Sequence, residues 1–215
     1  MKPKLNKKLN KIYKKLYHHF GPRRWWPGDT KFEIIVGAIL TQNTNWRNVE
    51  KAIDNLKKKK LLNPASLYKI PSKNLGALIK PSGYYNIKTK RLKEFMRYLF
   101  KKHGGSLRKM FDQDLHALRR ELLEVKGIGP ETADSILLYA GEKPIFVIDA
   151  YTKRILERHS LIDKDATYHQ TQELFMNNLN KNVKLFNEYH ALLVELGKTL
   201  CKKKPNCDSC PLKGL

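Results

Sequence analysis

The chain has 215 residues, of which 41% are hydrophobic, and its 43 Lys+Arg against 20 Asp+Glu leave a formal net charge of +23. Such an excess is typical of a protein that binds a polyanion, with nucleic acid as the first candidate, although part of it can also reflect a Lys-rich or thermophilic composition. No apolar run approaches the roughly 20 residues of a membrane span and no signal peptide is present, so we expect a cytoplasmic protein without membrane partners.

Amphipathic helical patterns, with apolar residues three or four positions apart, follow one another along the chain. Alternating strand patterns are nearly absent, and residues 145–148 are the one candidate. No internal repeat or low-complexity linker interrupts the pattern. The sequence therefore predicts an all-α fold. The predicted helices span residues 4–20, 31–41, 45–58, 85–103, 112–124, 131–140, 150–158, 167–179 and 183–199.

A short glycine hairpin, Lys126-Gly127-Ile128-Gly129-Pro130, separates two of these helices. Two glycines let the backbone turn and approach a ligand closely, and Pro130 is suited to a first helical turn. Free amides at such a helix start can hold a phosphate. The alternative is a plain turn that joins two helices and binds nothing.

Residues 122–159 as a whole, with Lys126-Gly-Ile-Gly129, Thr132-Ala133, Val147-Ile-Asp149 and Lys153-Arg154, resemble the helix-hairpin-helix and Gly/Pro-Asp loop of the endonuclease III superfamily of DNA glycosylases. Within it, the chain resembles the bacterial 3-methyladenine DNA glycosylase branch over nearly its whole length. The segments that carry this second resemblance are Trp25-Trp26-Pro27, Phe32-Glu33, Leu40-Thr-Gln-Asn-Thr44, Pro81-Ser-Gly-Tyr84 with Asn86, and Gly127-Ile-Gly129 with Ala133-Asp134.

The resemblance implies two helical domains that flank a DNA-binding groove, residues 1–28 with 142–215 and residues 29–141. It implies base excision repair by a nucleoid-associated monomer acting on double-stranded DNA that contains a damaged base. Lys126, Gly127, Gly129 and Lys153 are the residues it places against DNA.

Asp149 is the candidate catalytic residue. Cleavage of an N-glycosidic bond develops positive charge on the sugar, and a nearby carboxylate can stabilise that charge or activate the attacking water. An aspartate just before the predicted helix 150–158 is also what an ordinary N-cap requires. Both roles can coexist.

Glu131 stands where bifunctional members of the superfamily carry a lysine, whose amine forms a Schiff base with the sugar. A carboxylate forms no imine, so the resemblance implies a monofunctional glycosylase that leaves an abasic site. Glu131 is also expected at the base pocket. For Lys126, binding a phosphate or simple solvation is expected rather than covalent chemistry.

Trp25 and Trp46 are the aromatic pair that, by resemblance, sandwiches the flipped base. A purine methylated at N3 or N7 is cationic and gains from π-faces. Core packing is the alternative for both residues, and Trp26 is expected in the core or the pocket wall. Gln42 or Asn43 is the candidate wedge that fills the gap left by the base. The alternative is that Asn43, Thr44 and Asn45 cap the following helix. For Tyr84 and Tyr85, packing is the favoured interpretation.

Cys201, Cys207 and Cys210 resemble the C-terminal iron-sulfur loop of endonuclease III, in which four thiolates hold a [4Fe–4S] cluster. The family spacing places a fourth cysteine six positions after Cys210, one residue past Leu215. We expect a structural cluster, with an incomplete site or a Cys3His zinc site completed by His190 as alternatives.

Three function classes follow. The first is a monofunctional glycosylase that releases alkylated purines such as 3-methyladenine by base flipping and Asp-assisted hydrolysis. The second is an endonuclease III-like glycosylase and lyase for oxidised pyrimidines, which the cysteine loop favours. The third is a helix-hairpin-helix DNA-binding protein without catalytic activity.

Overall fold

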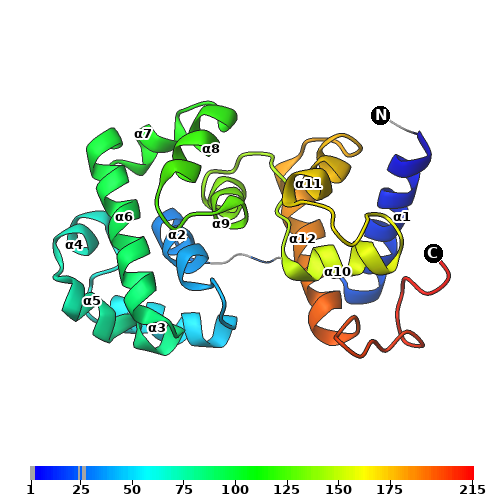
Figure 1. The fold of residues 1–215 in the computed structure, drawn as a ribbon, viewed down its shortest axis with the longest axis horizontal. Helices are drawn as coiled ribbons and strands as arrows, with labels where there is room; N and C mark the ends of the chain where they lie inside the picture. Colours follow the sequence, from blue (N-terminus) through cyan, green and yellow to red (C-terminus); the bar gives the residue numbers. More distant parts are fainter. Residues whose placement is uncertain (1–2, 24, 26–27) are drawn as a thin grey trace. The chain divides into compact units, whose positions relative to one another are not determined.

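A computed structural model describes residues 3–23, 25 and 28–215 of the chain. Helices joined by short loops make up this part, and no strand occurs among the described residues, which confirms the all-α prediction (Figure 1). The chain divides into two compact units. Residues 1–25 and 144–215 form the terminal unit, and residues 26–143 form the central unit. No described helix combines the length and apolar character needed to cross a membrane.

The helices of the two units have the following bounds. In the central unit they are α2 (Lys31–Leu40), α3 (Trp46–Lys58), α4 (Pro64–Lys69), α5 (Ser72–Ile79), the 3-10 turn η1 (Lys80–Ser82), α6 (Tyr85–His103), α7 (Leu107–Phe111), α8 (Leu115–Glu124), α9 (Pro130–Ser135) and the π-helical turn η2 (Ile136–Ala140). In the terminal unit they are α1 (Pro3–Phe20), α10 (Ala150–Arg158), α11 (Tyr168–Met176) and α12 (Val183–Thr199).

Helix α2 is the centre of the central unit. Its sequence Lys-Phe-Glu-Ile-Ile-Val-Gly-Ala-Ile-Leu is apolar on nearly every face, and eight of its ten residues are buried. A helix of this kind must be surrounded, and α2 contacts α3, α6, α9 and η2. Thr30 starts the helix by accepting a hydrogen bond from the Glu33 amide (3.1 Å).

The sequence pattern did not reveal helices α4, α5 and α7. Each has only five to eight residues, which is too short for a helical period to stand out. Two of them do begin at ordinary capping residues. Asn63 caps α4 by accepting a hydrogen bond from the Ser66 amide, and Ser106 caps α7. Capping residues alone are too common to predict a helix.

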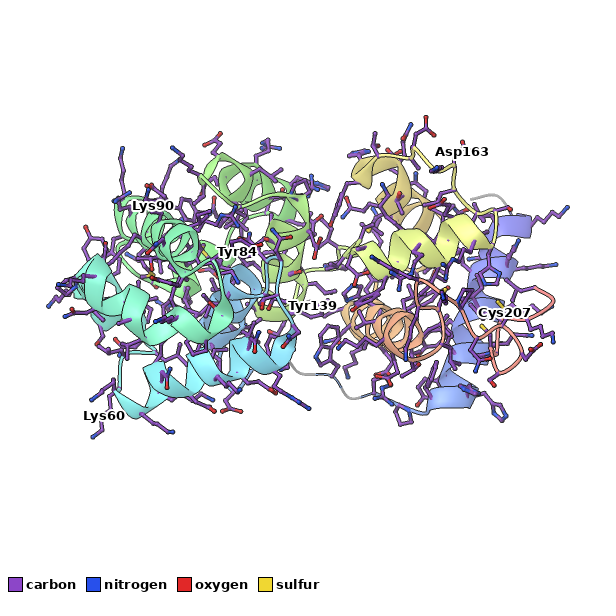
Figure 2. All side chains as sticks on the ribbon, turned by 60° about the horizontal axis from the view of Figure 1, so that its bottom comes forward. Lys60, Tyr84, Lys90, Tyr139, Asp163 and Cys207 are labelled. Carbon is purple, nitrogen blue, oxygen red and sulfur yellow. The ribbon has the colours of Figure 1, made fainter. Side chains whose placement is uncertain are left out.

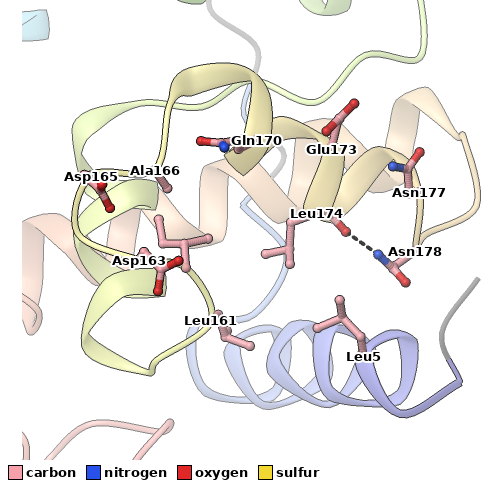
Figure 3. A pocket seen from close by; sticks show the side chains of 11 residues that line it. Leu5, Leu161, Asp163, Asp165, Ala166, Gln170, Glu173, Leu174, Asn177 and Asn178 are labelled. Atoms are coloured by element: carbon pink, nitrogen blue, oxygen red, sulfur yellow. Dashed lines mark hydrogen bonds between the residues drawn. The ribbon is translucent and has the colours of Figure 1, made fainter.

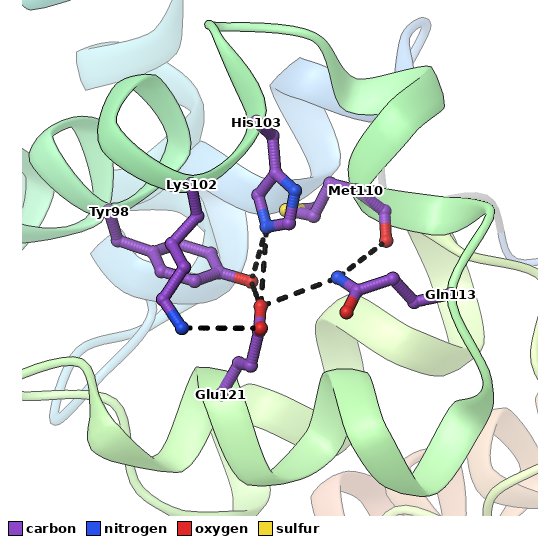
Figure 4. A network of polar contacts seen from close by, with 6 residues as sticks. All are labelled: Tyr98, Lys102, His103, Met110, Gln113 and Glu121. Atoms are coloured by element: carbon purple, nitrogen blue, oxygen red, sulfur yellow. Dashed lines mark hydrogen bonds and ion pairs between the residues drawn. The ribbon is translucent and has the colours of Figure 1, made fainter.

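A polar network joins α6 to α8 (Figure 4). Glu121 on α8 accepts hydrogen bonds from the Tyr98 hydroxyl (2.9 Å) and the Gln113 amide (3.3 Å), and it pairs with His103 (3.3 Å). Burial opposes ionisation of Glu121, but these donors lower its pKa overall. Burial, and then the bond to Glu121, raise the pKa of Tyr98. The network fixes α8, the first helix of the predicted hairpin motif, on α6.

A buried ion pair joins the two helices of that motif. Asp134 on α9 has 0% of its surface exposed and accepts from Arg119 on α8 at both carboxylate oxygens, with Nε–Oδ1 2.7 Å and Nη2–Oδ2 3.1 Å. A bidentate guanidinium–carboxylate pair fixes orientation as well as distance. The pair therefore sets how α8 and α9 meet on either side of the glycine hairpin.

In the terminal unit, residues 145–148 are buried but form no strand. Side chains of α11 satisfy their backbone, since Gln172 donates to the Phe146 carbonyl (2.7 Å) and the Tyr168 hydroxyl accepts from the Ile148 amide (3.4 Å). The Phe146 ring stacks on Phe175 with centroids 3.8 Å apart. This fixed segment leads directly into Asp149 and α10.

Replacing Asp134 tests the role of the ion pair. Asp134→Asn should lower the free energy of unfolding by about 3 kcal/mol, because the half-buried Arg119 loses its charge partner in a site where Asp134 is fully buried. Urea denaturation followed by circular dichroism measures this. The matched control is Glu94→Gln, which breaks a surface pair with Arg97 and should cost less than about 1 kcal/mol. Equal costs for the two variants would contradict the interpretation.

Candidate active site and DNA-binding hairpin

The hairpin between α8 and α9 is a tight turn whose ends are anchored in the core. The Ile128 amide donates to the Val125 carbonyl (2.9 Å), and the Ile128 side chain is buried. Gly127 adopts φ +92°, a conformation that favours glycine. Lys126, Gly127 and Gly129 are exposed. The turn thus presents two glycines and one lysine outward, and phosphate binding stays a prediction.

Two side chains support the hairpin from below. Gln42 donates through Nε2 to the Gly127 carbonyl (3.0 Å) and to the Thr132 hydroxyl (2.8 Å). Arg91 on α6 donates in turn to Gln42 Oε1. A Cβ atom on Gly127 would lie 2.4 Å from Arg91 Cγ. Sequence reasoning missed Arg91, because nothing near it in the chain signals a contact with the hairpin.

These contacts separate the two wedge candidates. The Gln42 amide is bound to the hairpin, whereas Asn43 is exposed and has a left-handed backbone with φ +55°. The capping alternative is confirmed for Asn45, whose side chain accepts a hydrogen bond from the Asn48 amide (3.1 Å) at the start of α3. Asn43 is therefore the better placed of the two to reach a ligand, and the wedge role itself stays a prediction.

Trp46 begins α3 and is half-buried. Its ring lies over Gly37 of α2, with Cη2 3.3 Å from where a Cβ atom on Gly37 would be. Packing on α2 thus accounts for part of the ring surface, and base contact stays a prediction.

The buried Lys88 amine donates to the Leu40 carbonyl (2.7 Å) and holds the end of α2. Burial, and then the nearby Arg91 charge, lowers the Lys88 pKa to about 8.

The tyrosine pair after the Pro-Ser-Gly turn behaves unequally. Tyr85 is half-buried and packs near Gly76, as expected. Tyr84 does not pack, which corrects the sequence interpretation: 67% of it is exposed and its backbone has φ +46° (Figure 2). The left-handed backbone at the start of α6 turns this side chain away from the core.

Asp149 is the N-cap of α10. Its Oδ1 accepts a hydrogen bond from the Thr152 amide at 2.7 Å, and its side chain is 13% exposed. The capping interpretation of the sequence is therefore confirmed. Capping fixes the carboxylate at a helix start, where the helix dipole also favours the negative charge. It leaves the catalytic role a proposal.

Two aromatic residues of the terminal unit lie next to Asp149 in a row. His190 on α12 is buried, and its Nε2 lies 3.8 Å from Asp149 Oδ1. The half-buried Trp25 stacks on His190 with ring centroids 5.7 Å apart and planes at 21°. Trp26 lies outside the described residues. Lys153, at the start of α10, donates to the Ala166 carbonyl at 2.5 Å.

Glu131 is exposed in the first turn of α9. A carboxylate at this end of a helix interacts favourably with the helix dipole. Residue 131 is a glutamate and not a lysine, and a carboxylate cannot form an imine with the sugar. The expected place of Glu131 at the base pocket stays a prediction.

Two arginines of α10 hold Cys201, the first of the three cysteines. Arg158 donates through Nη1 to the Cys201 sulfur (3.2 Å), and Arg154 donates to the Cys201 carbonyl (2.9 Å). Cys201 is buried, Cys207 is exposed (labelled in Figure 2), and burial raises the pKa of the Cys210 thiol.

Three cysteines supply part of the metal site expected from the family. A cluster of the endonuclease III type takes four thiolates, and this sequence has three cysteines. Among the described residues, no three His, Cys, Asp or Glu side chains gather as a metal site. His190, the alternative fourth ligand, lies instead against Asp149 and Trp25. No chemical step is assigned to a metal.

A pocket of about 560 Å³ also lies in the terminal unit, between α1, α11 and the loop before α11 (Figure 3). Its lining includes the acidic Asp163, Asp165 and Glu173, and it does not include Asp149 or Trp25. Acidic side chains repel a nucleic acid backbone. The pocket is therefore not the candidate site.

Comparison with known proteins identifies the relatives of this fold. Residues 36–181 match the HhH-GPD superfamily of base excision DNA repair proteins. The chain is 47% identical over 206 residues to a Methanocaldococcus jannaschii protein that carries the name of a DNA repair glycosylase, covering 95% of this chain and 94% of that protein. It is 32% identical over 187 residues to endonuclease III of Thermotoga maritima, covering 85% and 80%.

A solved structure of Helicobacter pylori 3-methyladenine DNA glycosylase, bound to 1,N6-ethenoadenine, has a TM-score of 0.76 and 30% identity to this chain, covering 91% of this chain and 96% of that one. The all-α fold and the glycine hairpin already define the class of helix-hairpin-helix proteins. With these relatives, the chain belongs to the HhH-GPD superfamily and is a DNA glycosylase.

The two hairpin glycines give a matched pair of variants. Gly127→Ala should lower the free energy of unfolding by about 1–3 kcal/mol, because alanine is strained at φ +92° and its Cβ meets Arg91. Gly129→Ala should leave stability within about 0.5 kcal/mol, since no atom lies within 4 Å of the added Cβ. Urea denaturation of both variants measures the difference. Equal losses would mean that neither φ nor Arg91 matters.

Proposed function

We propose that this DNA glycosylase is monofunctional and releases alkylated purines such as 3-methyladenine from double-stranded DNA. The observation that carries the proposal is the placement of Asp149, a carboxylate fixed at the start of α10 beside His190, on which Trp25 stacks. A second support is Glu131, which occupies the position where a lyase needs an amine. The 30% identity to the 3-methyladenine enzyme of H. pylori favours the same substrate class.

Asp149 is assigned to the sugar. Cleavage of the bond between base and C1′ leaves positive charge on the deoxyribose, and a carboxylate within reach stabilises that charge or takes a proton from the attacking water. The capping bond uses Oδ1, so we assign Oδ2 to the reacting group. Water adds at C1′, its proton passes to Asp149, and the base leaves with the bonding electrons.

Aromatic stacking is assigned to the base. An extruded purine methylated at N3 or N7 carries positive charge, which interacts favourably with the face of an indole ring. The proposal gives this role to Trp25, with Trp46 as the second aromatic residue. Methylation also makes the base a better leaving group, so a single carboxylate suffices.

DNA contact is assigned to the exposed hairpin. The amides near Gly127 and Gly129 and the Lys126 amine suit a phosphate, and the net charge of +23 supplies the general attraction. Asn43 is proposed to fill the space left by the flipped base. The proposal keeps the two domains as functional parts, residues 1–28 with 142–215 and residues 29–141, and a monomer as the active form.

One specific observation favours a second candidate. The chain is also related to endonuclease III of T. maritima, and the cysteine spacing resembles the cluster loop of that group. These two facts support a glycosylase and lyase for oxidised pyrimidines with a structural [4Fe–4S] cluster. Such an enzyme needs an amine at the sugar, and Glu131 does not supply one.

The first experiment compares wild type with Asp149→Asn on duplexes that carry 3-methyladenine, 7-methylguanine or thymine glycol. Wild type should release the methylated purines, and the variant should be slower by at least about a hundredfold, because the sugar cation loses its counter-charge. Free base is quantified by chromatography under single-turnover conditions. Unchanged release by Asp149→Asn would rule out the proposed role.

Strand cleavage separates the two candidates. After base release, the wild-type product should be nicked only after alkali treatment, and borohydride should trap no covalent adduct with DNA, since residue 131 carries no amine. Endonuclease III of T. maritima serves as the comparison enzyme on thymine glycol. Direct nicking at thymine glycol with a trapped adduct would support the lyase instead.

A further inference from the structure

His190 is a polar side chain in an otherwise apolar part of α12. Its neighbours Tyr189, Ala191 and Leu192 are buried, and only 4% of the histidine itself is exposed. A buried imidazole is costly unless a polar group compensates it. An ordinary core position would be filled at lower cost by leucine.

The imidazole makes two oriented contacts within the terminal unit. Its Nε2 edge points to Asp149, 3.8 Å from Oδ1, and one ring face lies on Trp25 at 21°. A distance of 3.8 Å is too long for a direct hydrogen bond, but a charge–dipole interaction at this distance is strong in a buried, weakly polar site. A carboxylate that is 13% exposed is therefore held from two sides, by the Thr152 amide and by His190.

The charge state of His190 follows from these surroundings. Burial lowers its pKa, and the Asp149 carboxylate opposes this by raising it, with burial the larger effect. A neutral ring with its hydrogen on Nε2 presents the positive end of the N–H dipole to Asp149.

We propose that His190 is a positioning residue, which couples the orientation of the Asp149 carboxylate to that of the Trp25 ring. The inference rests on the proposed function, because it assigns a role through Asp149. The histidine orients the carboxylate that faces the sugar and supports the indole that faces the base. Neither the hairpin nor the cysteine loop takes part.

The test measures single-turnover release of 3-methyladenine and, separately, binding to a duplex with a non-cleavable abasic analogue. His190→Leu preserves volume and removes the dipole, and it should slow release by about one to two orders of magnitude with binding unchanged, since small misplacement of a catalytic group costs this much. His190→Gln restores an N–H near Asp149 and should recover most of the rate. A purely structural role would move binding and rate together and gain nothing from glutamine.

A double variant shows whether His190 acts through Asp149. Asp149→Asn combined with His190→Leu should be no slower than Asp149→Asn alone, within about twofold, because the group to be positioned is already lost. Multiplied losses would overturn the inference, and so would a wild-type rate for His190→Leu. Should the leucine variant fail to fold, His190→Met, which also lacks an N–H, carries the same cycle.

The matched control is Tyr189→Phe. Tyr189 lies next to His190 on α12, and its hydroxyl donates a buried hydrogen bond to the Leu9 carbonyl of α1 (2.9 Å). Losing this bond should lower Tm without changing the rate of base release. The two proposals fail separately. If Asp149→Asn keeps wild-type activity, the proposed function and the positioning role both fall; if it is inactive while His190→Leu is normal, only the positioning role falls.

Discussion

The bidentate pair of Arg119 and Asp134 is the interaction on which the central unit's functional surface depends. It joins α8 to α9 at a place where the connecting chain is only a glycine turn and offers little apolar surface of its own. Because the aspartate is fully buried, its charge has to be compensated, and Arg119 does this with two parallel hydrogen bonds. The angle between the two helices, and with it the direction of the hairpin amides, follows from this geometry.

The hairpin is then held from below by residues that are far away in the sequence. Gln42 binds its backbone at Gly127, and Arg91 orients Gln42. The end of α2, two residues before Gln42, is fixed in turn by the buried amine of Lys88, which donates to the Leu40 carbonyl. Hydrogen bonds therefore fix the backbone that carries the exposed glycines, as close approach to a phosphate backbone requires.

In the terminal unit, a single carboxylate combines structure with the proposed chemistry. Capping by Asp149 orders the start of α10, and the segment before it is fixed by α11 through Gln172 and Tyr168. A residue that is already immobilised for folding loses little further freedom when it meets a substrate. The two interpretations of Asp149 that the sequence left open are therefore compatible, and the row of His190 and Trp25 beside it gives the carboxylate a defined direction.

The sequence by itself determined the helical class, the glycine hairpin and the cap at Asp149, because these features depend on neighbours within a few residues. Apolar residues at helical spacing predict a helix wherever the run is long enough, and a Gly-x-Gly-Pro turn has few other conformations. Short helices such as α7 were not predicted, because five residues are too few to show a helical period.

Only the tertiary structure decided which side chains meet. The sequence offered Gln42 or Asn43 as a wedge, Tyr84 as a packing residue and His190 as one possible metal ligand. The fold binds the Gln42 amide to the hairpin, exposes Tyr84 to solvent and places His190 beside Asp149. Arg91 drew no attention at all. Most of these placements join segments that are far apart along the chain. A local pattern of residues cannot predict such contacts, because packing and burial arise only when the helices come together.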